Sequence, residues 1–127
     1  MRVEGRGVSG IKSYKDLEIW KRSRLLVKRV YELTKMFPRE ERYDLISQIR
    51  RAVISIPSNI AEGHSRPGRK DFAQFLAIAI GSSAELETQL ILAHDLEYAK
   101  RAVLEPVLNE IDELQKMMHK LRQSLLK

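Results

Sequence analysis

Two long stretches in the second half of the chain repeat small or apolar residues at steps of three and four. The first stretch contains Phe72, Leu76, Ala79, Ser83, Leu86, Leu90 and Ala93. The second contains Leu104, Val107, Ile111, Leu114, Met118, Leu121 and Leu125. This heptad spacing places each set along one side of an α-helix and is typical of helices that pack lengthwise against other helices. No alternating strand pattern competes with it, so the repeat predicts an all-α fold.

The first half of the chain predicts two further helices. Apolar residues fall on one side of a helix over 14–37, which ends because the residue before Pro38 is pushed out of the helical region. A second amphipathic helix follows from Pro38, with two glutamates in its first turn, and ends with Gly63 as its C-cap. Pro57 inside this helix cannot donate a backbone hydrogen bond, so we expect a bend there without an end.

Three short connections join these four helices, including residues 64–68 between the second and the third. Short connections make consecutive helices antiparallel, and helices of this length cannot bury an apolar face alone. We therefore expect an up-down-up-down antiparallel four-helix bundle domain over residues 14–127. Residues 1–13, with three glycines and no apolar pattern, are predicted to form a flexible N-terminal arm.

The length of 127 residues suits one compact domain that builds its core without covalent support. The chain has no cysteine, which excludes disulfides, thiolate zinc sites and cysteine nucleophiles. No uninterrupted apolar run reaches the roughly 18 residues that a membrane span requires. We expect a soluble, cytoplasmic protein with no membrane partner.

The net charge of +6 is distributed unevenly along the chain. Residues 1–70 contain 17 basic and 8 acidic residues, whereas 71–127 contain 6 and 9, so the two parts carry +9 and −3. An excess of this kind favours an anionic partner, either a nucleic acid or an acidic protein surface.

Basic residues form two neighbouring stripes on the first predicted helix, at spacings that keep each stripe on one face. One stripe contains Lys21, Arg24, Lys28 and Lys35, and the other contains Lys15, Arg22 and Arg29. Both stripes lie off the apolar side, where they can meet successive phosphates of a nucleic acid. The alternative is a solvated face whose cations pair locally with Glu18 and Glu32.

A second group of cations, Arg66, Arg69 and Lys70, lies around the start of the third helix. Two glycines separated by four residues give this segment a superficial likeness to a phosphate-binding loop. Such a loop follows a strand and closes with Gly-Lys-Ser or Gly-Lys-Thr, and this segment has neither feature. We interpret it as a helix end, a turn and a helix start, where the three cations can contact an anion.

Polar residues share one face of the second predicted helix and continue on the third. The second helix contributes Gln48, Arg51, Ser55, Asn59 and Glu62, and the third contributes Ser82, Glu85 and Gln89. Because apolar residues flank these groups, we expect a partly buried polar network in which Arg50 or Arg51 contacts Glu85. Such a network would fix the helix register or a subunit contact.

Catalytic and metal-binding patterns are weak in this sequence. His94 and Glu97 are three residues apart, but a di-metal bundle needs two Glu-x-x-His motifs and two further glutamates. His64 falls in a predicted turn, and His119 falls on a basic helical surface. We therefore expect no catalytic residue, no metal site and no cofactor, hence a protein that is not an enzyme. A metal-dependent bundle enzyme is the weakest alternative, because its ligand set is missing.

Several blocks of the sequence resemble the four-helix bundle proteins encoded in intervening sequences of bacterial 23S ribosomal RNA genes. They are Tyr14 to Leu17 with Trp20, Phe37-Pro38 with Glu41, Gln48 to Ala52, Ser55 to Gly63, Phe72 with Phe75-Leu76, Gly81-Ser82 with Glu85-Leu86, and Leu96 with Tyr98. The block Ser-Ile-Pro-Ser-Asn-Ile-Ala-Glu-Gly is specific, and the likeness covers residues 14 to about 125. One departure is Glu97, where a glycine is common in that family.

This resemblance implies a short-looped bundle that assembles as a homopentamer around a central channel and has no established enzymatic activity. The family is also similar to the accessory protein of diversity-generating retroelements, a basic pentamer that binds nucleic acid and a reverse transcriptase. The partners implied are further copies of the chain, RNA or DNA, and a reverse transcriptase or another protein.

We expect a non-enzymatic, oligomeric bundle that binds RNA or DNA electrostatically, with weak sequence preference and strong salt dependence. Aromatic residues make up 6% of the chain and lie mostly on apolar faces, so we expect no stacking of bases on them. The alternative is a protein-interaction scaffold whose cationic face docks an acidic partner. Apolar residues outside the heptad seams predict a subunit interface, and they are Phe75, Ile78, Ile91, Leu92 and Leu108.

Overall fold

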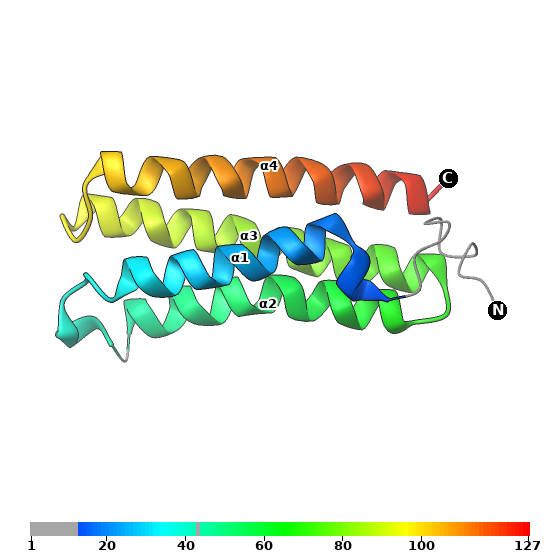
Figure 1. The fold of residues 1–127 in the computed structure, drawn as a ribbon, viewed down its shortest axis with the longest axis horizontal. Helices are drawn as coiled ribbons and strands as arrows, with labels where there is room; N and C mark the ends of the chain where they lie inside the picture. Colours follow the sequence, from blue (N-terminus) through cyan, green and yellow to red (C-terminus); the bar gives the residue numbers. More distant parts are fainter. Residues whose placement is uncertain (1–12, 43) are drawn as a thin grey trace.

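The computed structural model in Figure 1 describes residues 13–42 and 44–127. Within these residues the chain forms four long helices, two short 3₁₀ helices and no strand. The long helices are α1 (Glu18–Thr34), α2 (Leu45–Ser65), α3 (Arg69–Asp95) and α4 (Arg101–Leu125). The 3₁₀ helices are η2 (Tyr14–Asp16) and η3 (Arg39–Glu41). The predicted N-terminal arm lies outside the described residues except for Ser13.

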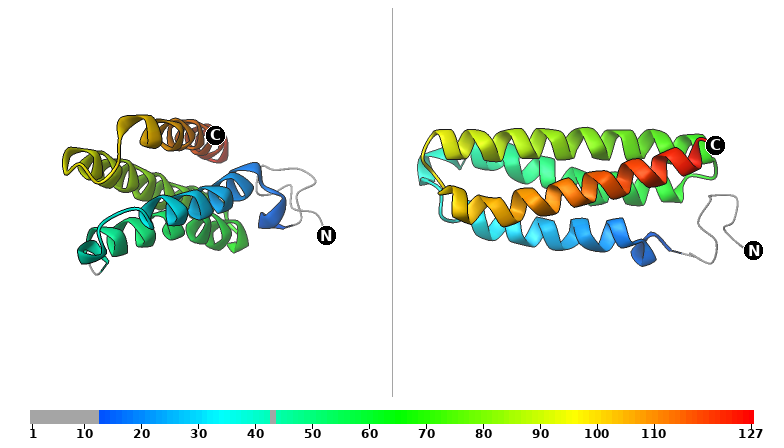
Figure 2. Two further views of the ribbon diagram at one scale, coloured as in Figure 1. Left: turned by 60° about the vertical axis from the view of Figure 1, so that its left-hand side comes forward. Right: turned by 90° about the horizontal axis from the view of Figure 1, so that it is seen from above.

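The four long helices lie side by side, and the chain reverses its direction at each connection (Figure 1, Figure 2). The prediction of an all-α four-helix bundle is confirmed. Packing is unequal around the bundle, because α2 and α3 share the most extensive contact and α1 and α4 the least. The seam between α1 and α4 is therefore the most open of the four.

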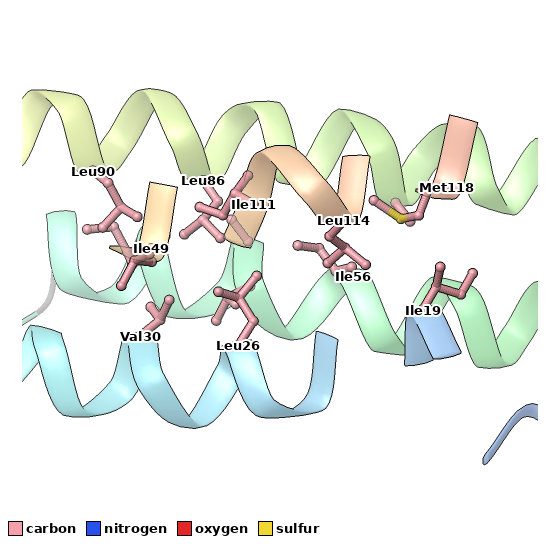
Figure 3. Close-up of a cluster of buried hydrophobic side chains, with 14 of the residues drawn as sticks. Ile19, Leu26, Val30, Ile49, Ile56, Leu86, Leu90, Ile111, Leu114 and Met118 are labelled. Carbon is pink, nitrogen blue, oxygen red and sulfur yellow. The ribbon is translucent and has the colours of Figure 1, made fainter. Parts of the chain in front are cut away.

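The core is one apolar cluster to which every long helix contributes (Figure 3). All seven predicted seam positions on α3 are buried, as are six of the seven on α4, and Leu121 is partly buried. Truncating one large buried side chain to alanine typically costs about 2–5 kcal/mol, so these positions fix where the helices lie. The first two long helices complete the cluster with residues that include Leu26, Val30, Ile49 and Ile56.

Two helix starts differ from the sequence-based predictions. α1 does not start at Tyr14, because η2 forms a separate turn and the extended residue Leu17, with ψ 130°, comes before the helix. α2 does not start at Pro38. The turn η3 ends before Arg42, and Asp44 has φ −124° and ψ −99°, which interrupts the helical conformation before α2 begins.

Gly63 permits a close approach between helices and is not the predicted C-cap. α2 runs through Pro57, as predicted, and continues past Gly63 to Ser65. A Cβ atom on Gly63 would lie 2.7 Å from Phe75 Cβ and 3.0 Å from Phe72 Cδ1. Only a residue without a side chain lets α2 come this close to α3.

His64 lies in the last turn of α2 and is buried, so its predicted place in a turn is wrong. Its ring meets the Phe72 ring edge to face, with 5.6 Å between their centroids. The helix ends at Ser65 because Arg66 is extended, with ψ 146°, and precedes Pro67.

A Schellman-type turn closes α3 around Glu97. The backbone N–H of Tyr98 donates to the carbonyl of Ala93, and that of Glu97 donates to the carbonyl of His94, both at 2.9 Å. Glu97 has φ 65°, and it is the one non-glycine residue with a positive φ among those described. This left-handed conformation suits glycine, so the chain holds a glutamate there under strain.

α3 is long and apolar enough to cross a membrane by length and composition alone, with a mean hydropathy of 1.3 over its most apolar stretch. In the bundle, 33% of that stretch is buried, and core helices of bundles meet the same criterion. The outward side of α3 is apolar as well, since Ile78 is 48% exposed and Leu92 is 46% exposed. One face of α3 thus fills the core while the other leaves apolar surface uncovered within one chain.

Candidate nucleic-acid interface

Four basic side chains form one outward face of α1 and its end, which we call the α1 cationic face. They are Lys21, Arg24, Lys28 and Lys35. At about 100° per residue they fall within about 60° of one another, opposite the side that buries Leu26 and Val30. The face is about 21 Å long at 1.5 Å per residue. All four side chains are exposed, and none forms a salt bridge with another described residue.

Arg22 and Arg29, predicted to lie on a neighbouring phosphate-binding stripe, connect α1 to α4 instead. Arg22 Nη1 lies 2.8 Å from Glu113 Oε1, and Arg29 Nη1 lies 2.9 Å from Glu110 Oε2. The hydrogen bond from Arg22 to Glu113 raises the pKa of the guanidinium. Arg22 also lies 3.5 Å from Glu18, so the local pairing considered as an alternative is present for this residue.

Arg66, in the connection between α2 and α3, is oriented by both helices. Its Nη2 lies 2.9 Å from Glu62 Oε2, and its guanidinium stands over the Phe75 ring at 5.1 Å from the centroid. Both members of the ion pair are about half exposed, so these contacts place Arg66 without removing its charge from the surface.

Arg69 caps the end of α4. Its guanidinium donates to the backbone carbonyl of Ser124 at 2.7 Å and to that of Leu125 at 3.3 Å. The last carbonyls of a helix have no partner within the helix, so a cation there satisfies them. Of the cations predicted at this connection, Lys70 is exposed and has no salt bridge or hydrogen bond to any described residue.

The predicted polar network between α2 and α3 is present in part. Ser55 Oγ lies 2.8 Å from Ser82 Oγ, and the Asn59 amide donates to the carbonyl and hydroxyl oxygens of Ser55 at 2.8 and 2.9 Å. These groups join the two helices across their seam. Gln48 instead donates to Asp44, one turn earlier in the chain, at 3.4 Å.

The predicted contact of Arg50 or Arg51 with Glu85 is not formed within one copy of the chain. Arg50 points to α1, where it donates to Thr34 Oγ1 at 3.0 Å and to the Tyr31 carbonyl at 3.3 Å. Its guanidinium also stands 4.3 Å from the Tyr31 ring centroid. Arg51 and Glu85 are exposed, and no salt bridge joins them. Adjacent residues of a helix point about 100° apart, so Arg50 and Arg51 face different neighbours.

A partly open pocket of about 380 Å³ lies between α1 and α2, beside the α1 cationic face. The Tyr14 and Trp20 rings meet edge to face, with 5.4 Å between centroids, and the Arg24 guanidinium lies 5.6 Å from the Trp20 ring centroid. Helical periodicity does not predict this pocket and led to the expectation of no base stacking, because Trp20 falls on the apolar side of α1 and its exposure depends on where α2 passes. Six of the lining residues are Tyr14, Trp20, Arg24, Ile54, Pro57 and Ser58.

Metal ligands do not gather in the part of the chain that the structure describes, where no three His, Asp or Glu side chains could hold an ion together. His94 and Glu97 are both exposed, and His94 Nδ1 lies 3.8 Å from Asp95 Oδ1. His119 is exposed on α4, as predicted. The expectation of no metal, no cofactor and no catalytic residue stays a prediction.

A profile of the family described as 23S rRNA-intervening sequence protein matches residues 15–120, a range that takes in nearly all of the four long helices. The chain belongs to this family. A solved structure from the S23 ribosomal protein family of Bacteroides thetaiotaomicron VPI-5482, described as a protein with unknown function, is 28% identical, with a TM-score of 0.77. The likeness covers 83% of this chain and 95% of that one. No curated protein sequence matches the chain.

Membership of the 23S rRNA-intervening sequence protein family confirms the resemblance seen in the sequence blocks. The α1 cationic face and Trp20 both lie inside the matched residues 15–120. Neither the family description nor that of the solved structure names an enzymatic activity or a bound ligand.

Proposed function

We propose that this member of the 23S rRNA-intervening sequence protein family is a non-enzymatic, oligomeric, cytoplasmic protein that binds RNA or DNA electrostatically. The α1 cationic face supports the proposal, because its four side chains are exposed and have no carboxylate partner among the described residues. The charge of an unpaired cation is fully available to a phosphate, whereas a paired cation must give up one ion pair to form another.

Binding of this kind depends strongly on salt and weakly on sequence. Each phosphate contact releases counterions, so four contacts to a single strand give a slope of about −3 in log affinity against log salt concentration. Phosphate contacts position a nucleic acid but carry no information about its bases.

The test compares two variants that lose the same charge. The first replaces Lys21, Arg24, Lys28 and Lys35 by glutamine, and the control replaces four exposed cations on or next to α4, namely Lys100, Arg101, Lys116 and Lys120. A titration of labelled RNA and single-stranded DNA from about 50 mM salt upward should show weaker binding and a slope nearer zero for the first variant. Equal losses in both variants, or no binding by the unaltered protein at about 50 mM salt, would contradict the proposal.

We also propose that copies of the chain associate through the outward face of α3. Ile78, Ile91 and Leu92 are exposed there, as the prediction of a subunit interface requires, while Phe75 and Leu108 are partly buried. Five copies, the number that the family resemblance implies, would carry a charge of about +30, and linked sites raise the overall affinity for a long polyanion.

Light scattering tests this association. Leu92→Lys should lower the mass of the assembly, whereas Val103→Lys, at a residue that is 40% exposed on α4, should leave it unchanged. A monomer at all concentrations would contradict the assembly but not the binding of nucleic acid by a single chain.

A second candidate function is a scaffold that docks an acidic protein partner, such as a reverse transcriptase. The observation in its favour is a groove of about 610 Å³ between α1 and α4, where Leu25 and Met36 are each 60% exposed and Lys28 lies at the side. An acidic amphipathic helix fits a groove of this kind. Leu25→Ser with Met36→Ser should weaken capture of such a partner and leave RNA affinity unchanged, which separates the two functions.

A further inference from the structure

Trp20 is the only tryptophan in the chain, and it lies at the boundary between the core and the α1 cationic face. Its ring and that of Tyr14 are both partly exposed and line the pocket between α1 and α2. The pocket is mostly apolar in character, with Ile54 and Pro57 on the α2 side. Its volume of about 380 Å³ lies within the range of about 300–1,000 Å³ that holds small flat ligands.

Arg24 belongs both to this pocket and to the α1 cationic face. Its guanidinium lies 5.6 Å from the Trp20 ring centroid, and the side chain is exposed. Lys21 lies three residues before Arg24 on the helix and Lys28 lies four residues after it, so cations continue to both sides of the pocket at the spacing of one helical turn. A strand whose phosphates follow α1 therefore passes directly beside an aromatic pocket.

We propose that this pocket receives an unpaired base of a single-stranded nucleic acid, which stacks on Trp20 while Arg24 holds the adjacent phosphate. The inference rests on the proposed function and specifies its ligand as single-stranded. Charged grooves joined to exposed aromatic rings are the usual means of holding single strands, because every base offers a flat face for stacking. Bases within a duplex are already stacked and would have to be flipped out at a cost.

Fluorescence of the single tryptophan gives a direct measurement. A short oligothymidylate is titrated into the full chain at about 50 mM salt, and an oligonucleotide of the same length without bases serves as the control. We expect the oligothymidylate to quench Trp20 emission and to bind about 5- to 100-fold more tightly than the abasic strand. Equal affinity for the two strands, or an emission that does not change, would overturn the stacking proposal.

The same titration separates this proposal from the broader one. If both strands bind with equal affinity and the same salt slope, the electrostatic function stands and the base pocket is wrong. If neither strand binds, the electrostatic function fails as well. Preference for a duplex of the same sequence over the single strand would also overturn the base pocket.

Two substitutions test the pocket from opposite sides. Trp20→Leu removes the stacking surface and should bring the affinity for oligothymidylate down to that for the abasic strand; because this variant has no tryptophan, its binding is followed with labelled strands. Ser58→Leu fills the pocket from α2 at an exposed position and should have the same effect without altering α1. Gln123→Leu, also exposed but on α4, is the matched control and should change neither affinity. Retention of the full preference for bases by Ser58→Leu would show that the base does not enter this pocket.

Discussion

Arg22 on α1 and Glu113 on α4 form a direct interhelical salt bridge, with 2.8 Å between Nη1 and Oε1. Arg29 and Glu110 repeat the arrangement further along the same seam at 2.9 Å. Two cations that share their helix with the α1 cationic face are thereby neutralised by α4. Pairing therefore decides which basic residues of α1 remain available to a polyanion.

Glu113→Gln is expected to strengthen nucleic-acid binding. The substitution removes the closer of the two carboxylate partners of Arg22 and leaves only Glu18 at 3.5 Å, so a fifth cation becomes more available beside Lys21 and the affinity at low salt should rise roughly two- to fivefold. Asp112→Asn adds the same net charge but frees Lys116, which pairs with Asp112 at 3.0 Å on α4. A salt titration should show a larger rise for Glu113→Gln than for Asp112→Asn, and equal rises would mean that net charge alone matters.

Two helical glycines are expected to respond to alanine with opposite signs. Gly63→Ala places a Cβ atom 2.7 Å from Phe75 Cβ, and such overpacking should lower the free energy of unfolding by about 1–3 kcal/mol. Gly81→Ala meets no atom within 4 Å and should raise it by about 1 kcal/mol through helix propensity. Urea unfolding at concentrations where light scattering shows single chains measures both. Stabilisation by Gly63→Ala would contradict the close approach of α2 and α3.

Glu97→Gly should stabilise the protein by about 0.5–1 kcal/mol, because a left-handed conformation strains an L-residue but not glycine. Glu97→Gln removes the charge but keeps the backbone strain, so it separates the effect of the charge on stability from the effect of the strain. Asp95→Gly, inside the last turn of α3, should destabilise by a similar amount. Thermal melts of the three variants measure these changes in stability. A loss of stability in Glu97→Gly would contradict the presence of backbone strain at this residue.

Tyr98 and Glu41 are expected to make stability depend on pH in the alkaline range. The Tyr98 hydroxyl donates to Glu41 Oε2, and loss of this hydrogen bond on ionisation raises the pKa of the phenol above its ordinary value of about 10. The stabilisation is therefore fully present below about pH 10 and is lost as the pH rises through the raised pKa.

Urea unfolding of the unaltered protein and of Tyr98→Phe at several pH values between 7 and 11 measures this effect. Tyr98→Phe should be less stable at neutral pH, and its stability should fall less steeply above pH 10. In an ultraviolet titration, Glu41→Gln should bring the Tyr98 pKa closer to its ordinary value. Identical pH profiles for the unaltered protein and Tyr98→Phe would contradict the role of this hydrogen bond.

The packing of the bundle follows directly from sequence periodicity. The seam residues of α3 and α4, except the partly buried Leu121, are buried as predicted because a heptad repeat leaves one choice of inward side. Helix ends were less predictable. The glutamates of η3 suit a helix start, but the conformation of Asp44 places that start at Leu45. From the sequence alone, Gly63 fits a helix C-cap as well as it fits a close contact between two helices. Only the position of Phe75 in the structure distinguishes these two roles.

The candidate site could be predicted only in part, because side-chain partners come from distant parts of the chain. The helical spacing of Lys21 and Lys28 defines a face whatever else surrounds it. The pairing of Arg22 depends on Glu113, which is 91 residues away in the chain. The pocket at Trp20 likewise depends on where Ile54 and Pro57 of α2 lie. Periodicity within one helix carries no information about either contact.

Unequal packing around the bundle also has a dynamic consequence. α2 and α3 are bound together most extensively, whereas α1 is held more weakly against α4. Regions with fewer packed contacts open locally at a lower free energy than the whole molecule unfolds, so the amide hydrogens of α1 should exchange faster than those of α2 and α3. A ligand that contacts both α1 and α2 binds only molecules in which α1 is packed against the bundle, so it slows the exchange of the α1 amide hydrogens. Binding at the α1 cationic face would then be detected as slower amide hydrogen exchange along α1, even where the shape of the bundle does not change.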